Sequence, residues 1–143
     1  MIRRTNELTN PIFIIPCSGI GKAYGTISRE ATYCVVEDLR KKDTDTLCLS
    51  LLVIGDKETR QLVKSHLCIA VDGCPLECAK KNLEFSGAKL AANFRVIDLI
   101  KEHRNLKPKS ITFLDEEGIE LAKILANKIA LKVDELNRGE TAS

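Results

Sequence analysis

Six cysteines occur in this chain of 143 residues, and three of them stand where their sulfur atoms could do chemistry. Cys17 follows one short apolar run, Cys74 follows another, and Cys78 lies four residues beyond Cys74. Cysteine thiolates bind soft metal ions such as Zn²⁺, and they also act as nucleophiles. The sequence therefore predicts that these three cysteines form one site.

The segment Asp72-Gly-Cys-Pro-Leu-Glu-Cys78 is the most specific local feature. If Pro75 is the first residue of a helix, Cys74 is its N-cap, where free backbone N–H groups and the helix dipole favour the thiolate. Cys78 then follows at i+4, with Cβ atoms about 5–6 Å apart, while two sulfurs on one zinc are roughly 3.8 Å apart. Side-chain rotamers can close this difference. We expect Gly73 to supply a backbone conformation that a side chain would hinder.

The other cysteines and the two histidines give different expectations. Cys34 lies on the apolar stripe of a predicted helix and Cys68 lies inside an apolar run, so we expect both to be core residues, because buried cysteine behaves as a small hydrophobe. Cys48 could belong either to the core or to the site. His66 and His103 lie outside the predicted ligand turns, and we expect them at the surface.

Strands and helices alternate along the chain and must position these residues. Apolar runs predict strands at residues 11–16, 46–54, 67–71 and 93–100, and helical periodicity predicts helices at 26–42, 56–66, 75–85 and 116–136. This order is typical of an α/β fold, here a single three-layer, Rossmann-like domain with a mostly parallel sheet. We expect a polar segment over residues 1–10 and one metal-binding domain over 11–143 that ends in a long helix.

The predicted fold also explains how distant cysteines could meet. Ligand sites in parallel α/β sheets form at the carboxyl ends of the strands. Cys17 and Cys74 are 57 residues apart in the sequence, yet each follows a predicted strand. The site is therefore predicted at that edge of the sheet.

Composition excludes several classes of protein. The net charge is +2, aromatic residues make up 4% of the chain and Trp is absent, so we expect no nucleic-acid partner. No apolar run approaches the length that spans a membrane. We find no credible secretory signal, and we expect a cytoplasmic protein, in which many cysteines point to metal or thiol chemistry rather than to disulfides.

Three segments carry a resemblance to a known family. Pro16-Cys-Ser-Gly19, the segment Leu47-Cys-Leu-Ser50 and the segment Val71-Asp-Gly-Cys-Pro-Leu-Glu-Cys-Ala-Lys80 resemble the DGC-domain family of zinc-binding proteins, over roughly residues 11 to 100. The resemblance implies a four-cysteine zinc site but no particular reaction. The ligands that it implies are Cys17, Cys48, Cys74 and Cys78. Cys48 departs from the expected pattern, because Leu-Ser follows it where we expect Leu-Pro.

Two alternatives remain open from the sequence. The same thiolates could hold an iron–sulfur cluster, although Cys-x3-Cys is not a common ferredoxin spacing. The chain could instead be a cysteine-dependent enzyme, because residues 17–22 loosely resemble the phosphocysteine loop of sugar phosphotransferase domains. A disulfide from Cys17 to Cys74 or Cys78 would indicate thiol redox or sulfur relay. The leading prediction is a small zinc-binding protein, with metal sensing or handling as open roles and with the protein partner or small-molecule substrate unknown.

Overall fold

The centre of the fold is a four-stranded parallel sheet with the strand order β2-β1-β3-β4. A computed structural model describes residues 10–17, 23–73, 75–109 and 113–139. The strands are β1 (Ile12–Pro16), β2 (Thr44–Asp45), β3 (Leu67–Asp72) and β4 (Lys89–Arg95). This arrangement confirms the predicted α/β class with a parallel sheet.

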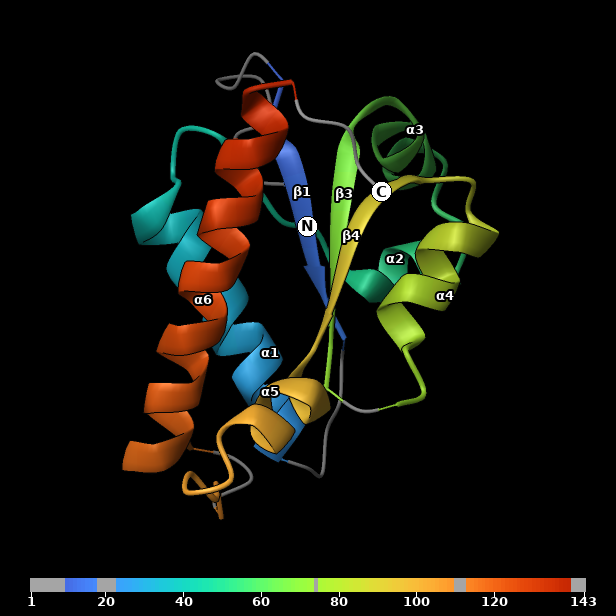
Figure 1. Cartoon of the computed structure of the whole chain (residues 1–143). Coiled ribbons are helices and arrows are strands. Elements are labelled where there is room, and N and C mark those ends of the chain that lie inside the picture. Colours follow the sequence, from blue (N-terminus) through green and yellow to red (C-terminus); the bar gives the residue numbers. More distant parts are fainter. Residues whose placement is uncertain (1–9, 18–22, 74, 110–112, 140–143) are drawn as a thin grey trace.

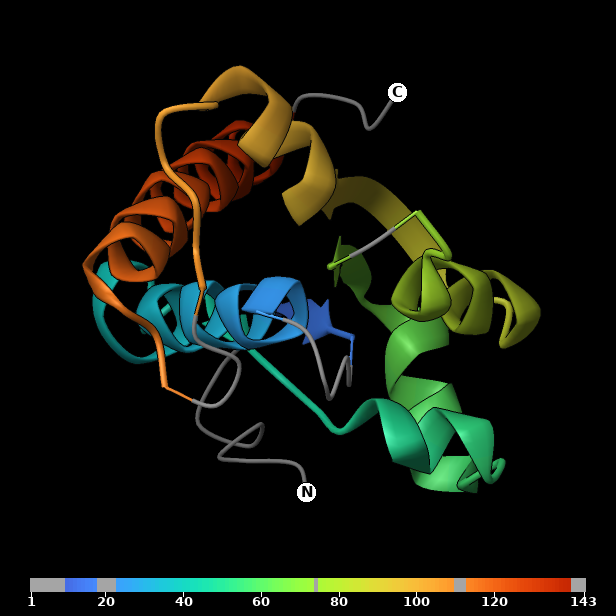
Figure 2. The ribbon, with the colours of Figure 1, turned by 90° about the horizontal axis from the view of Figure 1, so that it is seen from below.

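Helices cover both faces of the sheet and give three layers (Figure 1). One face carries α1 (Ala23–Cys34), the π-helical turn η2 (Val35–Leu39), α5 (Val96–Glu102) and α6 (Glu116–Asn137). The other face carries α2 (Leu49–Val53), α3 (Lys57–Ser65) and α4 (Cys78–Phe85). Figure 2, seen from below, shows the same two groups of helices on opposite sides of the strands. In the described part of the chain, no helix has the length and apolar character needed to cross a membrane.

The two central strands are apolar on both sides because both of their faces are buried. Alternate side chains of a strand point to opposite faces. Ile14 of β1 and Ile69 of β3 therefore belong to the core under α1 and α6, whereas Phe13 and Ala70 belong to the core under α3 and α4. All four side chains are fully buried.

The strand order reverses between β1 and β3. The chain passes from β1 to β2 on one side and returns to β3 on the other, and α1 and α4 lie on opposite faces. In doubly wound sheets, ligands bind where the strand order reverses, outside the carboxyl ends of the strands. Cys17 directly follows β1 and Gly73 directly follows β3, so both residues lie at this switch point.

Two of the predicted strands are wrong in their extent. Residues 46–54 contain no strand: β2 ends just before them, at Thr44–Asp45, and Leu49–Val53 forms a helix. Its buried residues, Leu49 and Leu52, have the i, i+3 spacing of a helix face. Residues 93–100 likewise contain only the end of β4, after which Val96–Glu102 is helical and buries Val96 and Leu99. Short apolar runs fit either element by periodicity alone.

Two predicted helices differ at their ends. The helix predicted at 26–42 begins earlier, at Ala23, and its last turn is the π-helical Val35–Leu39. The helix predicted from Pro75 begins at Cys78, with Glu77 as its N-cap. Cys74 is therefore not the N-cap of this helix, and Cys74 itself lies outside the described residues.

Candidate metal centre

Cys17 is held at the end of β1 by the neighbouring strand β3. Its backbone N–H donates to the Val71 carbonyl at 2.9 Å, which extends the strand pairing by one residue. Its sulfur accepts a hydrogen bond from the backbone N–H of Gly73 at 3.2 Å. The Cys17 side chain is only 6% exposed. The sulfur is therefore fixed against the turn that follows β3.

A short hydrogen-bond chain links Cys17 to α1. The Ser28 hydroxyl donates to the Gly25 carbonyl at 2.7 Å and lies 3.5 Å from the Cys17 sulfur. A serine hydroxyl has one hydrogen to donate. Because Ser28 gives that hydrogen to Gly25, the Cys17 thiol donates to Ser28 in this arrangement. A Cys17 thiolate would have no hydrogen for this bond and could only accept one from Ser28.

Gly73 is required by a close approach of two backbones. A Cβ atom at this position would lie 2.9 Å from the Gly25 nitrogen and 3.0 Å from the Tyr24 carbonyl carbon. Gly73 is not among the described glycines with positive φ, which are Gly55, Gly87 and Gly139. A side chain is hindered at Gly73, as expected, but the cause is the lack of space and not a positive φ. The turn after β3 packs directly on the first turn of α1.

Cys48 shares a cavity with Cys17. It lies between β2 and α2, at the N-cap of α2, and it is exposed. A cavity of about 240 Å³ is lined by both cysteines and also by Arg29 and Tyr33. Burial acts to raise the pKa of the Cys48 thiol, but interaction with the Ser50 hydroxyl and with N–H groups at the start of α2 outweighs it and lowers the pKa below its usual value.

Asp72 organises the segment that carries Cys78. Its carboxylate is 1% exposed and accepts hydrogen bonds from the backbone N–H groups of Ala79 at 2.7 Å and Lys80 at 3.1 Å. It also accepts one from Nδ2 of Asn93, on β4, at 3.0 Å. These bonds satisfy the free N–H groups at the start of α4. Asp72 therefore sets where the helix begins, and with it the position of Cys78.

The first residue of α4, Cys78, is exposed. The residue before it, Glu77, has φ 54° and ψ 49°, a left-handed conformation that is uncommon outside glycine. This bend redirects the chain between the turn after β3 and α4. The Cys78 thiol is thus presented at the surface at the beginning of a helix.

Of the four predicted ligands, the structure brings Cys17 and Cys48 to one cavity and places Cys78 at the start of α4. Cys74 lies outside the described residues. Among the residues that the structure describes, no three His, Cys, Asp or Glu side chains gather in a group that could hold a metal ion. The four-cysteine site therefore stays a prediction.

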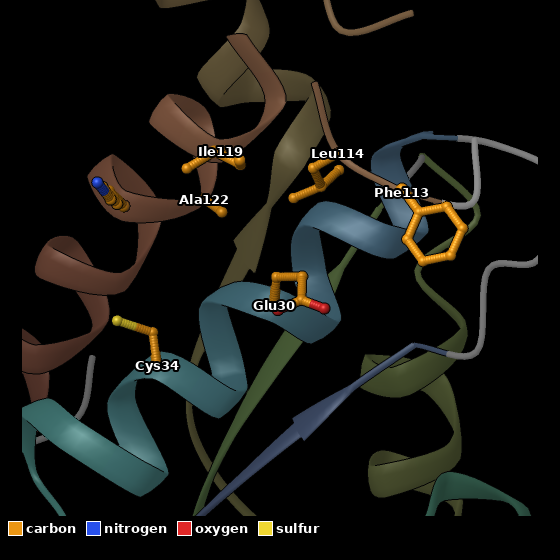
Figure 3. Close-up of a pocket in the computed structure, with 7 residues that line it drawn as sticks. Glu30, Cys34, Phe113, Leu114, Ile119 and Ala122 are labelled. Carbon is orange, nitrogen blue, oxygen red and sulfur yellow. The ribbon is translucent and has the colours of Figure 1, made fainter. Parts of the chain in front are cut away.

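The remaining cysteines lie away from this edge. Cys68 is fully buried in β3, and burial raises the pKa of its thiol to about 12, as expected for a core residue. Cys34 is only half-buried and lines a cavity of about 360 Å³ between α1 and α6. Figure 3 shows Cys34 and Glu30 on α1 facing Ile119 and Ala122 on α6. Burial, followed by the charge of Asp38, raises the pKa of Cys34.

Sequence reasoning missed three polar residues at or near the site. The Asp-Gly-Cys motif contains Asp72 but does not indicate its hydrogen bonds, while Asn93 and Arg29 carry no local signal in the sequence. Asn93 reaches Asp72 from a different strand, and Arg29 reaches the cavity from α1. Only an accurate placement of strands and helices could have identified them.

The described residues define a small three-layer α/β domain with Cys17 and Gly73 at the switch point of its parallel sheet. The family model described as DGC domain matches residues 13–123. The chain therefore belongs to the DGC-domain family. Comparison with curated proteins and with solved structures gave no match.

Proposed function

We propose that this protein binds one Zn²⁺ ion through the thiolates of Cys17, Cys48, Cys74 and Cys78. The observation that carries the proposal is the shared cavity of Cys17 and Cys48 at the carboxyl end of β1. The N–H of Gly73 already donates to the Cys17 sulfur. Such a bond stabilises a thiolate, which is the form that binds metal.

The donor set fits zinc by its chemistry. Zn²⁺ accepts four thiolates in a tetrahedral site, and the lowered pKa of Cys48 favours its thiolate. Because Cys17 and Cys48 line one cavity while Cys78 begins α4, the proposal includes a rearrangement on binding that draws these thiols to a common ion. Four bound sulfurs would leave the ion no open coordination position.

Metal handling or sensing suits this placement better than a structural role. The described residues form two apolar cores, one on each face of the sheet. The proposed site lies at the edge of the sheet, so the ion is not needed to complete either core. We therefore expect the protein to remain folded without zinc and to exchange the ion with a chelator.

A second candidate function is thiol chemistry. The exposed Cys48, with its lowered pKa, shares a cavity with a second thiol and with Arg29. Each described cysteine is a free thiol. A nucleophilic or redox role at Cys48 requires that its thiolate is not held by metal. Metal content therefore discriminates between the two functions.

The test is metal analysis of the purified chain and of single Cys→Ser variants. We expect one zinc per chain in the wild type and a sharp loss of zinc on replacing Cys17, Cys48, Cys74 or Cys78. Cys68→Ser is the matched control, because Cys68 lies in the core, and it should retain the metal. X-ray absorption should report four sulfur neighbours.

Three results would overturn the zinc proposal. The first is a purified protein that contains no metal and does not take up added zinc. The second is zinc that stays bound in both the Cys17 and the Cys48 variants. The third is loss of metal from Cys68→Ser alone. Metal-free protein with rapid alkylation of Cys48 would favour thiol chemistry instead.

A further inference from the structure

We propose a second site, a pocket for an organic phosphate between α5, the loop that follows it and the first turn of α1. The structure has a cavity of about 450 Å³ at this place. Its lining includes three basic residues, which are Lys101, Arg104 and Lys107. The volume lies within the range of small-molecule sites, about 300–1,000 Å³.

No ion pair joins Lys101, Arg104 or Lys107 to an acidic residue in the described part of the chain. None of the described residues that line the cavity carries a carboxylate. The two acidic residues of α5 pair elsewhere: Asp98 with Arg95 at 2.8 Å and Glu102 with Lys128 at 2.9 Å. Lys101 lies within electrostatic reach of Asp98. The cavity therefore combines three positive charges with no acidic residue in its lining.

The loop after α5 is held in place by its backbone. The N–H of Lys107 donates to Glu117 at 3.3 Å, and the N–H of Lys109 donates to Asp115 at 3.0 Å. Glu117 and Asp115 at the start of α6 each accept one of these bonds. These two bonds tie the loop to the start of α6, and Lys107 also lines the cavity.

The helix dipole does not account for all three charges. Cations near the end of a helix are favourable, and Lys101 lies in the last turn of α5. Arg104 and Lys107 lie beyond its last residue, Glu102. Because Arg104 and Lys107 line the same cavity as Lys101, we infer that this cavity binds an anion. Arg and Lys are the side chains that usually bind phosphate.

The remaining lining selects an organic phosphate over a bare ion. Tyr24, Leu106 and Pro108 provide an aromatic ring and apolar walls beside the charges. Tyr24 lies in the first turn of α1, in contact with the Gly73 turn. The start of α1, α5 and the loop after α5 lie at the end of the sheet where β1 and β3 end (Figure 1). This is the edge where α/β sheets bind their ligands.

The test is a titration of the full chain with phenyl phosphate, followed by amide chemical shifts. We expect saturable shifts around Tyr24 and residues 100–108, and at least ten-fold weaker binding of inorganic phosphate. Lys101→Gln and Arg104→Gln should each weaken binding of phenyl phosphate at least five-fold. Lys64→Gln is the matched control, because Lys64 is an exposed lysine on α3 across the sheet, and it should bind as the wild type does.

Repeating the titration with Cys48→Ser separates this inference from the metal proposal. The affinity of the variant for phenyl phosphate should equal that of the wild type. Equal weakening in the Lys64 variant, or equal affinity for phenyl and inorganic phosphate, would overturn the inference. The inference would also be overturned if a hexaglutamate peptide bound the same residues more tightly than phenyl phosphate does. The cavity would then be part of a surface that binds acidic protein segments.

Discussion

Replacing Asp72 by Asn should uncouple the Cys78 segment from the sheet. The buried carboxylate accepts three hydrogen bonds, from Ala79, Lys80 and Asn93. The Asn amide keeps one oxygen, which can retain the shortest bond, to Ala79. Its NH₂ group then faces the donors of Lys80 and Asn93, so both of these bonds are lost in Asp72→Asn.

The size of this effect follows from the two lost bonds. A hydrogen bond to a charged group contributes about 1.5–3 kcal/mol, and the variant gains back part of the cost of burying a charge. We expect a loss of about 3 kcal/mol in the free energy of unfolding, which a domain with a stability of about 5–15 kcal/mol tolerates. The melting temperature should fall by roughly 10 °C.

Urea unfolding followed by circular dichroism measures this loss. The matched control is Asp98→Asn, because Asp98 is half-exposed and pairs with Arg95 at the surface, where such pairs contribute about 0.2–1 kcal/mol. Hydrogen exchange gives the local readout, since the amides of Ala79 and Lys80 should lose protection in Asp72→Asn. A loss no larger than that of the control, or unchanged protection of these two amides, would refute the role assigned to Asp72.

Two other expectations concern thiol reactivity and pH. In the metal-free protein at pH 8, iodoacetamide should modify Cys48 quickly, because the pKa of its thiol is lowered. Cys68 should stay unmodified until the protein unfolds, because burial raises the pKa of its thiol to about 12. Mass spectrometry of the labelled peptides measures both reactions, and labelling of Cys68 in the folded protein would contradict this expectation. The hydrogen bond from Arg40 lowers the pKa of Asp134, so their pair should stabilise the fold above the usual carboxylate pKa and lose this contribution as the pH falls. In urea unfolding, Asp134→Asn should therefore lower the free energy of unfolding by about 0.5 kcal/mol at neutral pH and leave it unchanged near about pH 2. If the variant and the wild type differ by the same free energy at both pH values, the ion pair is not the cause.

The central part of the fold could be read from the sequence because its signals are local. The segments that form β1 and β3 are apolar runs. The apolar stripe of α6 repeats over about six helical turns, from Glu116 to Asn137. The strand ends then put Cys17 and Gly73 at one edge of the sheet. These positions depend only on period and on the rules of parallel sheets.

The other features of the fold depend on contacts between residues that are far apart in the sequence. The start of α4 is set by Asp72, whose third partner comes from β4. The apolar run around Cys48 fits a strand by composition, yet Leu49 and Leu52 pack as a helix face. Gly73 is glycine because α1 approaches it, and the approach depends on the tertiary fold.

The position of α6 has a consequence for synthesis on the ribosome. The core under α3 and α4 is built from residues that precede β4 or begin it, so that face can close early. The core on the opposite face includes Leu121, Leu125, Ile129 and Val133 of α6, which are translated after the other elements of this fold. Until α6 emerges, the nascent chain presents an incomplete apolar layer over α1. Chaperones recognise exposed apolar surface of this kind, and a ribosome stalled before Glu116 should therefore hold the chain in a form that they bind.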